Sequence, residues 1–423
     1  MKHIILTECY DKLRITDEEA PKAINQSQAD ELADFIVKQR LKTEYINWGN
    51  KSITFINYVG YIQCSTFSIE ILPKVAMHDD PRQMRKVLLE MLNDCGYINV
   101  TTSKLSQLQL MDGSLLEIFG RIYADSLFVE LNKGVTTKYC EVENNLMTLK
   151  GSLIIPKHIQ ENLSRNKKYM AYCEYDERVI DHVLNQVFKA ANHLILPKVR
   201  NIETQKLLKQ IVHYLDGVSL KSFSPKQLDR LKLDRTNKRF EIPLILAKQF
   251  LVNKTASFST NNQSSFSLLF EMNDLFEKYI AVLVKKATNH LVIEQDNTHR
   301  LLVKETNNRE IFQLKPDIVI DNGSDQMIID TKWKTLTTGN RSGVKREDLY
   351  QMYVYLTRYE RAKTAILLYP QPLNLDTNYD EQLESWCLHA DTNKKLKVFA
   401  VSLLNKVQTV KEIREIIKNN GPD

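Results

Sequence analysis

The chain has 423 residues, of which 43% are hydrophobic and 26% charged, and its formal net charge at pH 7 is +6. These proportions are typical of a soluble globular protein with two or three domains of about 100–200 residues each. The six cysteines form no C-x-x-C pair, which argues against a zinc knuckle or a disulfide framework and indicates reduced thiols. No apolar run approaches the roughly 20 residues that span a bilayer, and the N-terminus lacks a signal peptide, so we expect a cytoplasmic protein without a membrane partner.

Residues 1–140 are predicted to form a mixed β/α domain. Alternating apolar residues indicate strands over 53–64 and 66–72. Apolar residues at helical spacing predict helices over 27–42, 81–93 and 113–132.

Residues 141–255 are predicted to form a mostly helical region. A short strand is expected over 149–156, an exposed polar loop over 160–168, a long helix over 176–196, and mainly helices over 199–252. The polar, Ser/Thr/Asn-rich stretch 253–265 shows no periodicity and is predicted to be a linker.

Residues 266–423 are predicted to form the third domain. Expected elements are a helix over 268–286, a strand over 291–294, a hairpin over 311–334, a helix over 345–359, strands over 364–369 and 397–403, and a closing helix over 409–418. This order is typical of a mixed sheet flanked by helices, so the fold class is α/β. The sequence contains no G-x-x-x-x-G-K-[ST] motif, which indicates that the chain has no phosphate-binding loop of its own.

The hairpin over 311–334 concentrates charge in an apolar setting. Two runs rich in Val and Ile are separated by Asp-Asn-Gly-Ser-Asp, which suits a tight turn. A turn centred between Gly323 and Ser324 places Asp317 opposite Asp330, and strand alternation places Lys332 on the same face as Asp330. The sequence therefore predicts two carboxylates and one ammonium at one point.

Such a cluster fits metal-assisted phosphodiester hydrolysis. Two neighbouring carboxylates, Asp317 and Asp330, can share a Mg²⁺ ion, which prefers oxygen ligands and keeps several waters. Lys332 can position the attacking water, help deprotonate it, or stabilise charge on the phosphate. The alternative is an ordinary surface ion pair between Asp330 and Lys332. However, this is the single D/E-x-K tripeptide in the sequence, and its flanks are apolar.

Three further residues are candidates for supporting roles. Glu277 lies beside the apolar stripe of the helix over 268–286 and can reach a metal site, or it is simply a boundary residue. Gln351 and Tyr355 share one helical face and can orient a phosphate or the lysine, or they pack at the edge of the core. The basic loop 339–345 is either a contact to the DNA backbone or a solvated loop.

These residues resemble a known nuclease superfamily. Pro316-Asp317, Asp330-Thr331-Lys332 and Gln351-x-x-x-Tyr355 are similar to the PD-(D/E)xK pattern in its branch with a Q-x-x-x-Y helix. More narrowly, the motifs resemble McrC, the endonuclease subunit of McrBC modification-dependent restriction systems. They are strongest over about 270–370, in the segments 272–277, 314–317, 330–334, 348–353 and 367–370, and weaker upstream in 71–74, 150–153 and 173–176.

The resemblance implies a restriction-endonuclease-like fold for 266–423, with Asp317, Asp330 and Lys332 as catalytic residues. It also implies DNA as substrate and a McrB-like AAA+ GTPase hexamer as partner, whose GTP hydrolysis the chain stimulates through its N-terminal part. No motif maps the contact with the GTPase; the polar tract 160–168 is our expectation for it. Two alternatives remain open: a standalone repair or end-processing nuclease of the same fold, and a non-catalytic module that binds DNA and stimulates a GTPase.

Overall fold

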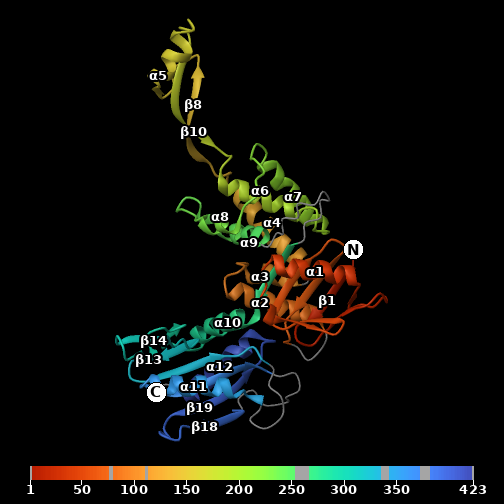
Figure 1. Ribbon diagram of the computed structural model, residues 1–423, viewed down its shortest axis with the longest axis vertical. Helices are drawn as coiled ribbons and strands as arrows, with labels where there is room; N and C mark the ends of the chain where they lie inside the picture. The colour runs from red at the N-terminus through yellow and green to blue at the C-terminus, as the bar shows by residue number, and fades with distance from the viewer. Residues whose placement is uncertain are drawn as a thin grey trace. The chain divides into compact units, whose positions relative to one another are not determined.

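The computed structural model describes residues 2–75, 80–109, 113–252, 266–334, 343–371 and 382–421. The chain divides into two compact units (Figure 1). Unit 1 joins Met1–Leu115 with Thr255–Asp423, and unit 2 consists of Leu116–Lys254. These limits differ from the predicted domains 1–140, 141–255 and 266–423, because the N-terminal strands and the C-terminal domain share one unit. The predicted linker 253–265 lies outside the described residues.

The first sheet of unit 1 combines strands from both ends of the chain. Its order is β1-β7-β6-β11; β1 and β7 run parallel, and the other neighbours are antiparallel. The strands β6 and β7 are buried along their whole length, and α2 packs on β7 and on α10. The elements are β1 (Lys2–Thr7), β6 (Tyr58–Gln63), β7 (Phe67–Leu72), β11 (Phe266–Glu271), α2 (Pro81–Asp94), α3 (Thr102–Gln109) and α10 (Met272–Ala287).

A second, smaller sheet follows β1 in the chain and has the order β3-β2-β5-β4. Helix α1 begins with a capping box in which Asn25 and Gln28 satisfy each other's backbone N–H groups. Its apolar face, which includes Leu32 and Phe35, joins one buried core with residues of both sheets. The elements are β2 (Leu13–Ile15), β3 (Ala23–Ile24), α1 (Gln26–Lys38), the 3₁₀ turn Thr43–Tyr45, β4 (Ile46–Gly49) and β5 (Ser52–Phe55).

The C-terminal part of unit 1 contains a mixed sheet of order β12-β15-β16-β17-β19-β18. Helix α11 packs on β17, and its Met352 and Leu356 share a buried core with Val319 and Ile328 of the sheet. Helices α10 and α12 pack on each other. The predicted α/β class, a mixed sheet with flanking helices, is confirmed. The elements are β12 (Leu291–Glu294), β15 (Ile318–Asp321), β16 (Gln326–Thr331), α11 (Arg346–Arg358), β17 (Ala362–Pro370), β18 (Glu384–Cys387), β19 (Lys395–Val401) and α12 (Lys406–Asn420).

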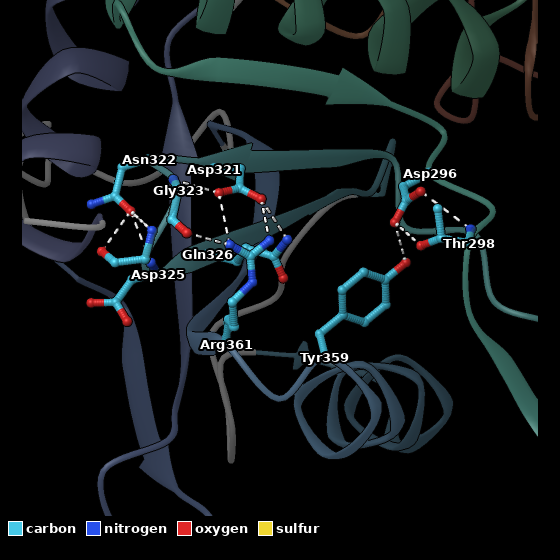
Figure 2. Close-up of polar contacts among 10 residues, drawn as sticks. Asp296, Thr298, Asp321, Asn322, Gly323, Asp325, Gln326, Tyr359 and Arg361 are labelled. Carbon is cyan, nitrogen blue, oxygen red and sulfur yellow. Dashed lines mark hydrogen bonds and ion pairs between the residues drawn. The ribbon is translucent and has the colours of Figure 1, made fainter.

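The hairpin predicted over 311–334 is present but shorter than expected. Its central strands are β15 and β16, whereas residues 311–313 belong to β14 (Arg309–Gln313), which pairs with β13 (Arg300–Lys304) in a separate ribbon. At the turn, Asn322 accepts hydrogen bonds from Ser324 and Asp325, and Gly323 has φ 98° (Figure 2). This positive φ is why a glycine suits the turn.

Two polar anchors hold the hairpin and its neighbour β12 against the rest of the sheet (Figure 2). Arg361, just before β17, makes an ion pair of 2.6 Å with Asp321 at the end of β15. Tyr359, just after α11, donates a 2.8 Å hydrogen bond to the buried carboxylate of Asp296. These contacts fix both the hairpin and the end of α11, the two elements that carry the candidate site.

Unit 2 has a helical body whose core is aromatic. Tyr123 packs edge-on against Phe250, and its hydroxyl donates 3.0 Å to the carbonyl of Phe188. The predominance of helices over 199–252 is confirmed. The elements are α4 (Leu115–Asn132), α6 (Val183–Ile195), α7 (Ile202–Tyr214), α8 (Pro225–Arg230), the 3₁₀ turn Lys238–Phe240 and α9 (Glu241–Val252).

A long antiparallel ribbon leads away from this helical body (Figure 1). It consists of β8 (Lys138–Leu146) and β10 (Ala171–Val179), with β9 (Ser152–Leu153), α5 (Ile155–His158) and the π-helical turn Ile159–Leu163 toward its far end. The prediction of one helix over 176–196 was wrong at its start, because residues 176–179 pair with β8. The strand predicted over 149–156 is shorter, and the predicted loop 160–168 begins inside the π-helical turn.

Candidate active site

The β15–β16 register places the two predicted carboxylates opposite each other. The ladder pairs Ile320 with Met327 and Ile318 with Ile329. The same register, continued by one step, brings Asp317 opposite Asp330, as the sequence predicted. Asp317 lies just before β15 and Asp330 near the end of β16, so both lie at the same end of the hairpin. Lys332 follows directly after β16 at this end.

Asp317 is held by the residue that follows Asp330. Its Oδ2 accepts hydrogen bonds from the backbone N–H of Thr331 at 2.7 Å and from the Thr331 hydroxyl at 2.8 Å. Burial raises the pKa of Asp317, and the two hydrogen bonds from Thr331 lower it, so the net pKa lies above the usual value. The Thr331 contacts therefore fix the orientation of a carboxylate that binds its proton more tightly than an exposed one.

Asp330 is almost fully buried, with 1% of its surface exposed. Its Oδ2 forms an ion pair with Lys332 Nζ but accepts no well-aligned hydrogen bond in the described part of the chain. Burial, followed by the charge of Asp317, raises the pKa of Asp330, and Lys332 opposes this only in part. For Lys332, burial lowers the pKa, but the charge of Asp330 outweighs this and the net pKa is raised. Burial thus favours the neutral form of both acids more than the neighbouring lysines, Lys332 and Lys315, favour the charged form.

Helix α11 brings Gln351 and Tyr355 to the cluster. Gln351 Oε1 accepts from Lys332 Nζ at 3.0 Å, and Gln351 Nε2 donates to Asp330 Oδ1 at 3.3 Å and to the Tyr355 hydroxyl at 2.8 Å. The orientation of the amide follows from its partners, because an ammonium only donates and a carboxylate only accepts. The predicted i, i+4 pair is therefore part of the cluster and does more than pack at the edge of the core.

Glu277 is near the cluster but less directly connected. It lies on α10, which begins at Met272, so the prediction of a helix from residue 268 was wrong and residues 266–271 form β11. Its Oε1 accepts from Gln295 Nε2 at 2.6 Å, and Gln295 in turn donates its backbone N–H to the carbonyl of Asp317. Burial, followed by the charge of Asp317, raises the pKa of Glu277. The structure thus places a third acid within the electrostatic range of Asp317.

Most of the sequence matches a known protein family. A family model described as McrBC 5-methylcytosine restriction system component matches residues 53–370. The chain belongs to this family. No curated protein matches the sequence.

Two solved structures from Thermococcus gammatolerans are similar to this McrBC-family chain. One is a refined half-complex from a tetradecameric assembly of McrB AAA+ hexamers with bound McrC, at 20% identity and a TM-score of 0.75, covering 99% of both chains. The other is a cryo-EM structure of the McrBC complex, at 22% identity and a TM-score of 0.54, covering 67% of this chain and 88% of that one. The predicted likeness to McrC is confirmed at the level of family and fold.

One buried acid of this McrBC-family chain was not predicted as part of the site. Asp348, in the first turn of α11, is 5% exposed and accepts two 2.9 Å hydrogen bonds from Lys334 Nζ. Its charge also raises the pKa of Asp330. The sequence held a signal for this pair. Asp348 lies three residues before Gln351, on the same side of the helix, and Lys334 lies two residues after Lys332. Of the predicted basic loop 339–345, residues 339–342 lie outside the described residues.

The residues of the cluster fit a hard divalent cation, although they do not form a closed cage. Among the described residues, no three His, Cys, Asp or Glu side chains lie close enough to hold a metal ion together. Mg²⁺, however, is commonly held by one or two carboxylates with waters completing its octahedron. Burial raises the pKa values of Asp317 and Asp330, and the charge of Asp317 adds to the rise for Asp330, so a cation held between the two carboxylates would favour their charged forms.

None of the described helices has the length and apolar character needed to cross a membrane.

Proposed function

We propose that this chain is the Mg²⁺-dependent DNA endonuclease subunit of a McrBC-like restriction complex. The observation that carries the proposal is the cluster of Asp317, Asp330, Lys332 and Gln351 at the end of the β15–β16 hairpin, joined by the contacts described above. The family membership of the chain supports the restriction context.

Each residue has a distinct role in this proposal. Asp317 and Asp330 would hold the ion directly, and Glu277, which does not lie close enough to share it with them, would bind one of its waters. Bound there, Mg²⁺ would neutralise charge that builds up on the phosphate and would acidify a water. Lys332, an ammonium fixed by Asp330 and Gln351, stabilises negative charge on the scissile phosphate and orients the attacking water. Gln351 holds the lysine, and Tyr355 holds Gln351.

The proposed partner is a McrB-like AAA+ GTPase hexamer whose GTP hydrolysis this chain stimulates. One of the similar structures contains McrB AAA+ hexamers with bound McrC, which supports this pairing. The ribbon of unit 2 is the proposed docking element, since its far end exposes apolar side chains, among them Met147 at 79% and Tyr169 at 67%. The tract 160–168 lies in this part, and apart from Asn162 and the half-buried Glu161 its residues are exposed. Exposed apolar side chains gathered at one place are typical of an interaction site.

Asp330→Asn tests the site without changing the shape of the side chain. In the presence of the GTPase partner, GTP and Mg²⁺, the variant should lose cleavage of methylated DNA while still stimulating GTP hydrolysis. Asp325→Asn is the matched control, because Asp325 lies on the same hairpin and its carboxylate pairs with the exposed Lys363, away from Asp317 and Asp330. Full cutting by Asp330→Asn would refute the assignment. Equal cutting by the wild-type chain without the partner would favour a standalone nuclease.

A further inference from the structure

The active-site strand continues into a tryptophan that is buried against the N-terminal sheet. Trp333, directly after Lys332, is 4% exposed. Its Nε1–H donates to Glu8 Oε1 at 2.5 Å, and Glu8 is separated from it by 325 positions in the chain. Glu8 is 1% exposed and follows the last residue of β1. The contact therefore links the candidate site to the first strand of the protein.

A second residue of the same sheet binds the backbone of Trp333. Lys74 follows β7, which pairs in parallel with β1, so Glu8 and Lys74 emerge at the same end of the sheet. Lys74 Nζ donates to the carbonyl of Trp333 at 3.4 Å and lies 5.4 Å from the centre of its indole ring. Phe276 of α10 packs against that ring at 5.2 Å between centroids. Both the side chain and the backbone of Trp333 are thus fixed.

The side chains of Lys332 and Trp333 reach different neighbours from the short segment after β16, in which the Lys334 N–H donates to the Lys332 carbonyl. The backbone N–H of Lys332 still donates to the carbonyl of Leu368, which keeps the segment on the sheet. The Lys332 side chain then turns to α11, where Gln351 lies, and the Trp333 side chain turns to α10 and the N-terminal sheet. A shift of the Trp333 backbone, which Lys74 holds at its carbonyl, would move Lys332, because adjacent residues share a planar peptide.

We propose that Glu8 and Lys74 are positioning residues that set the location of Lys332 by holding Trp333. The proposal rests on the role of Lys332 in the proposed nuclease function. Neither Glu8 nor Lys74 touches the Asp317–Asp330 cluster in any described contact, so both would act through Trp333. The N-terminal sheet thereby becomes part of the scaffold that holds the site.

The choice of residues supports positioning over simple packing. Phe276 and the surrounding apolar side chains would bury an indole ring without any charge. A buried carboxylate is expensive to desolvate, and Glu8 Oε2 has no hydrogen-bond partner in the described part of the chain. What Glu8 adds is direction: it fixes the rotation of the ring through the indole N–H, while Lys74 fixes the backbone. An error of about 1 Å in the place of a catalytic group can reduce the rate on the order of 10²-fold.

The experiment compares Glu8→Leu, Glu8→Gln, Trp333→Phe and the double variant Glu8→Leu/Trp333→Phe in the full chain assembled with the GTPase partner. Glu8→Leu and Trp333→Phe should each lower kcat for DNA cleavage about tenfold or more and leave KM unchanged. The double variant should cleave no more slowly than the slower of the two single variants, because both substitutions remove the same hydrogen bond. Glu8→Gln retains an acceptor for the indole N–H and should restore most of the activity.

Glu70→Gln is the matched control, since Glu70 is a fully buried carboxylate of the same sheet that binds Arg85 and the backbone of Leu115 and does not touch Trp333. Its kcat per folded molecule should equal that of the wild type. Equal losses in Glu70→Gln and Glu8→Leu, or multiplying losses in the double variant, would overturn the proposal.

A readout independent of cleavage separates this proposal from the proposed function. The carbon-13 resonance of dimethylated Lys332, assigned by its loss in Lys332→Arg, should shift in Glu8→Leu and Trp333→Phe and not in Glu70→Gln. A wild-type complex that cuts no DNA would refute the proposed function, and the lysine resonance would still decide the positioning. An unmoved resonance in both variants would refute the positioning itself.

Discussion

Gln351 accepts a hydrogen bond from Lys332 at 3.0 Å, and this bond joins helix α11 to the segment that follows strand β16. The other end of the same amide donates to Asp330. A single neutral side chain thus sets the spacing between the ammonium and the carboxylate of the cluster. Hydrogen bonds to charged groups are among the stronger ones in proteins, so the amide restrains both partners.

Gln351→Leu should therefore reduce the single-turnover rate of DNA cleavage by about 10²-fold, because Lys332 and Asp330 lose their common partner. The fold should persist, since leucine suits the helix and is similar in size. The matched control is Gln26→Leu, which removes an exposed helical glutamine that also donates to an aspartate, Asp30, at 2.8 Å. Cleavage by Gln351→Leu at the rate of the control would show that the amide has no role.

Tyr355→Phe should give a smaller loss of about fivefold, because it removes one hydrogen bond to Gln351, and a neutral hydrogen bond contributes about 1 kcal/mol. Tyr353→Phe offers a control on the same helix, since Tyr353 is 49% exposed. The two variants should be compared in the same cleavage assay. Equal rates would mean that the Tyr355 hydroxyl does not support the site.

The features that could be predicted from the sequence are those that form within a short stretch of chain. Asp317, Asp330 and the turn between them lie within 14 residues, and the alternation of apolar residues fixes their register. Gln351 and Tyr355 follow from helical spacing. The contact between Glu8 and Trp333 left no such signal, because it joins residues 325 positions apart. For the same reason residues 268–271 were predicted to be helical. Their apolar run suits either structure, and the pairing of β11 with β6 decides for the strand.

This pairing yields a prediction about the C-terminal part of the chain. A fragment of residues 266–423, the predicted nuclease domain, should not fold cooperatively by itself, because β11 would lose its partner β6 and Trp333 would lose Glu8 and Lys74. Thermal unfolding followed by circular dichroism should show no sharp transition. A cooperative, cleavage-competent fragment would show that the N-terminal sheet is dispensable.

Two buried carboxylates of the N-terminal sheet should affect stability with opposite signs as pH changes. Burial raises the pKa of Glu8 to about 7, from 4.5, with Lys74 and Trp333 opposing the shift. For Glu70, burial also acts to raise the pKa, but His3 and Arg85 outweigh it and the net pKa is lowered. The stability linked to Glu8 is therefore complete below pH 4.5 and is lost as pH rises to about 7. The stability linked to Glu70 is present above the unfolded pKa and is lost as pH falls through the folded one.

Glu8→Gln should remove a pH-dependent contribution on the order of 3 kcal/mol between pH 4.5 and 7, because a tenfold change in proton affinity corresponds to about 1.4 kcal/mol. The free energy of unfolding of this variant, relative to the wild type, should thus improve as pH rises across this range. Glu70→Gln should show the reverse and be most destabilised at neutral pH. Urea denaturation at a series of pH values measures both, and parallel pH profiles for the two variants would contradict the assignment of the charges.

Mg²⁺ should stabilise the chain even in the absence of DNA, since it would relieve the repulsion between Asp317 and Asp330 that accompanies their raised pKa values. At about ten times the Kd, a ligand that binds only the folded state adds about 1.4 kcal/mol, which raises the midpoint temperature by a few degrees. Asp330→Asn should abolish most of this stabilisation, because it removes one of the two negative charges, whereas Asp325→Asn on the same hairpin should retain it. An equal Mg²⁺-dependent rise in the wild type and in Asp330→Asn, measured by scanning calorimetry with and without a chelator, would place the ion elsewhere.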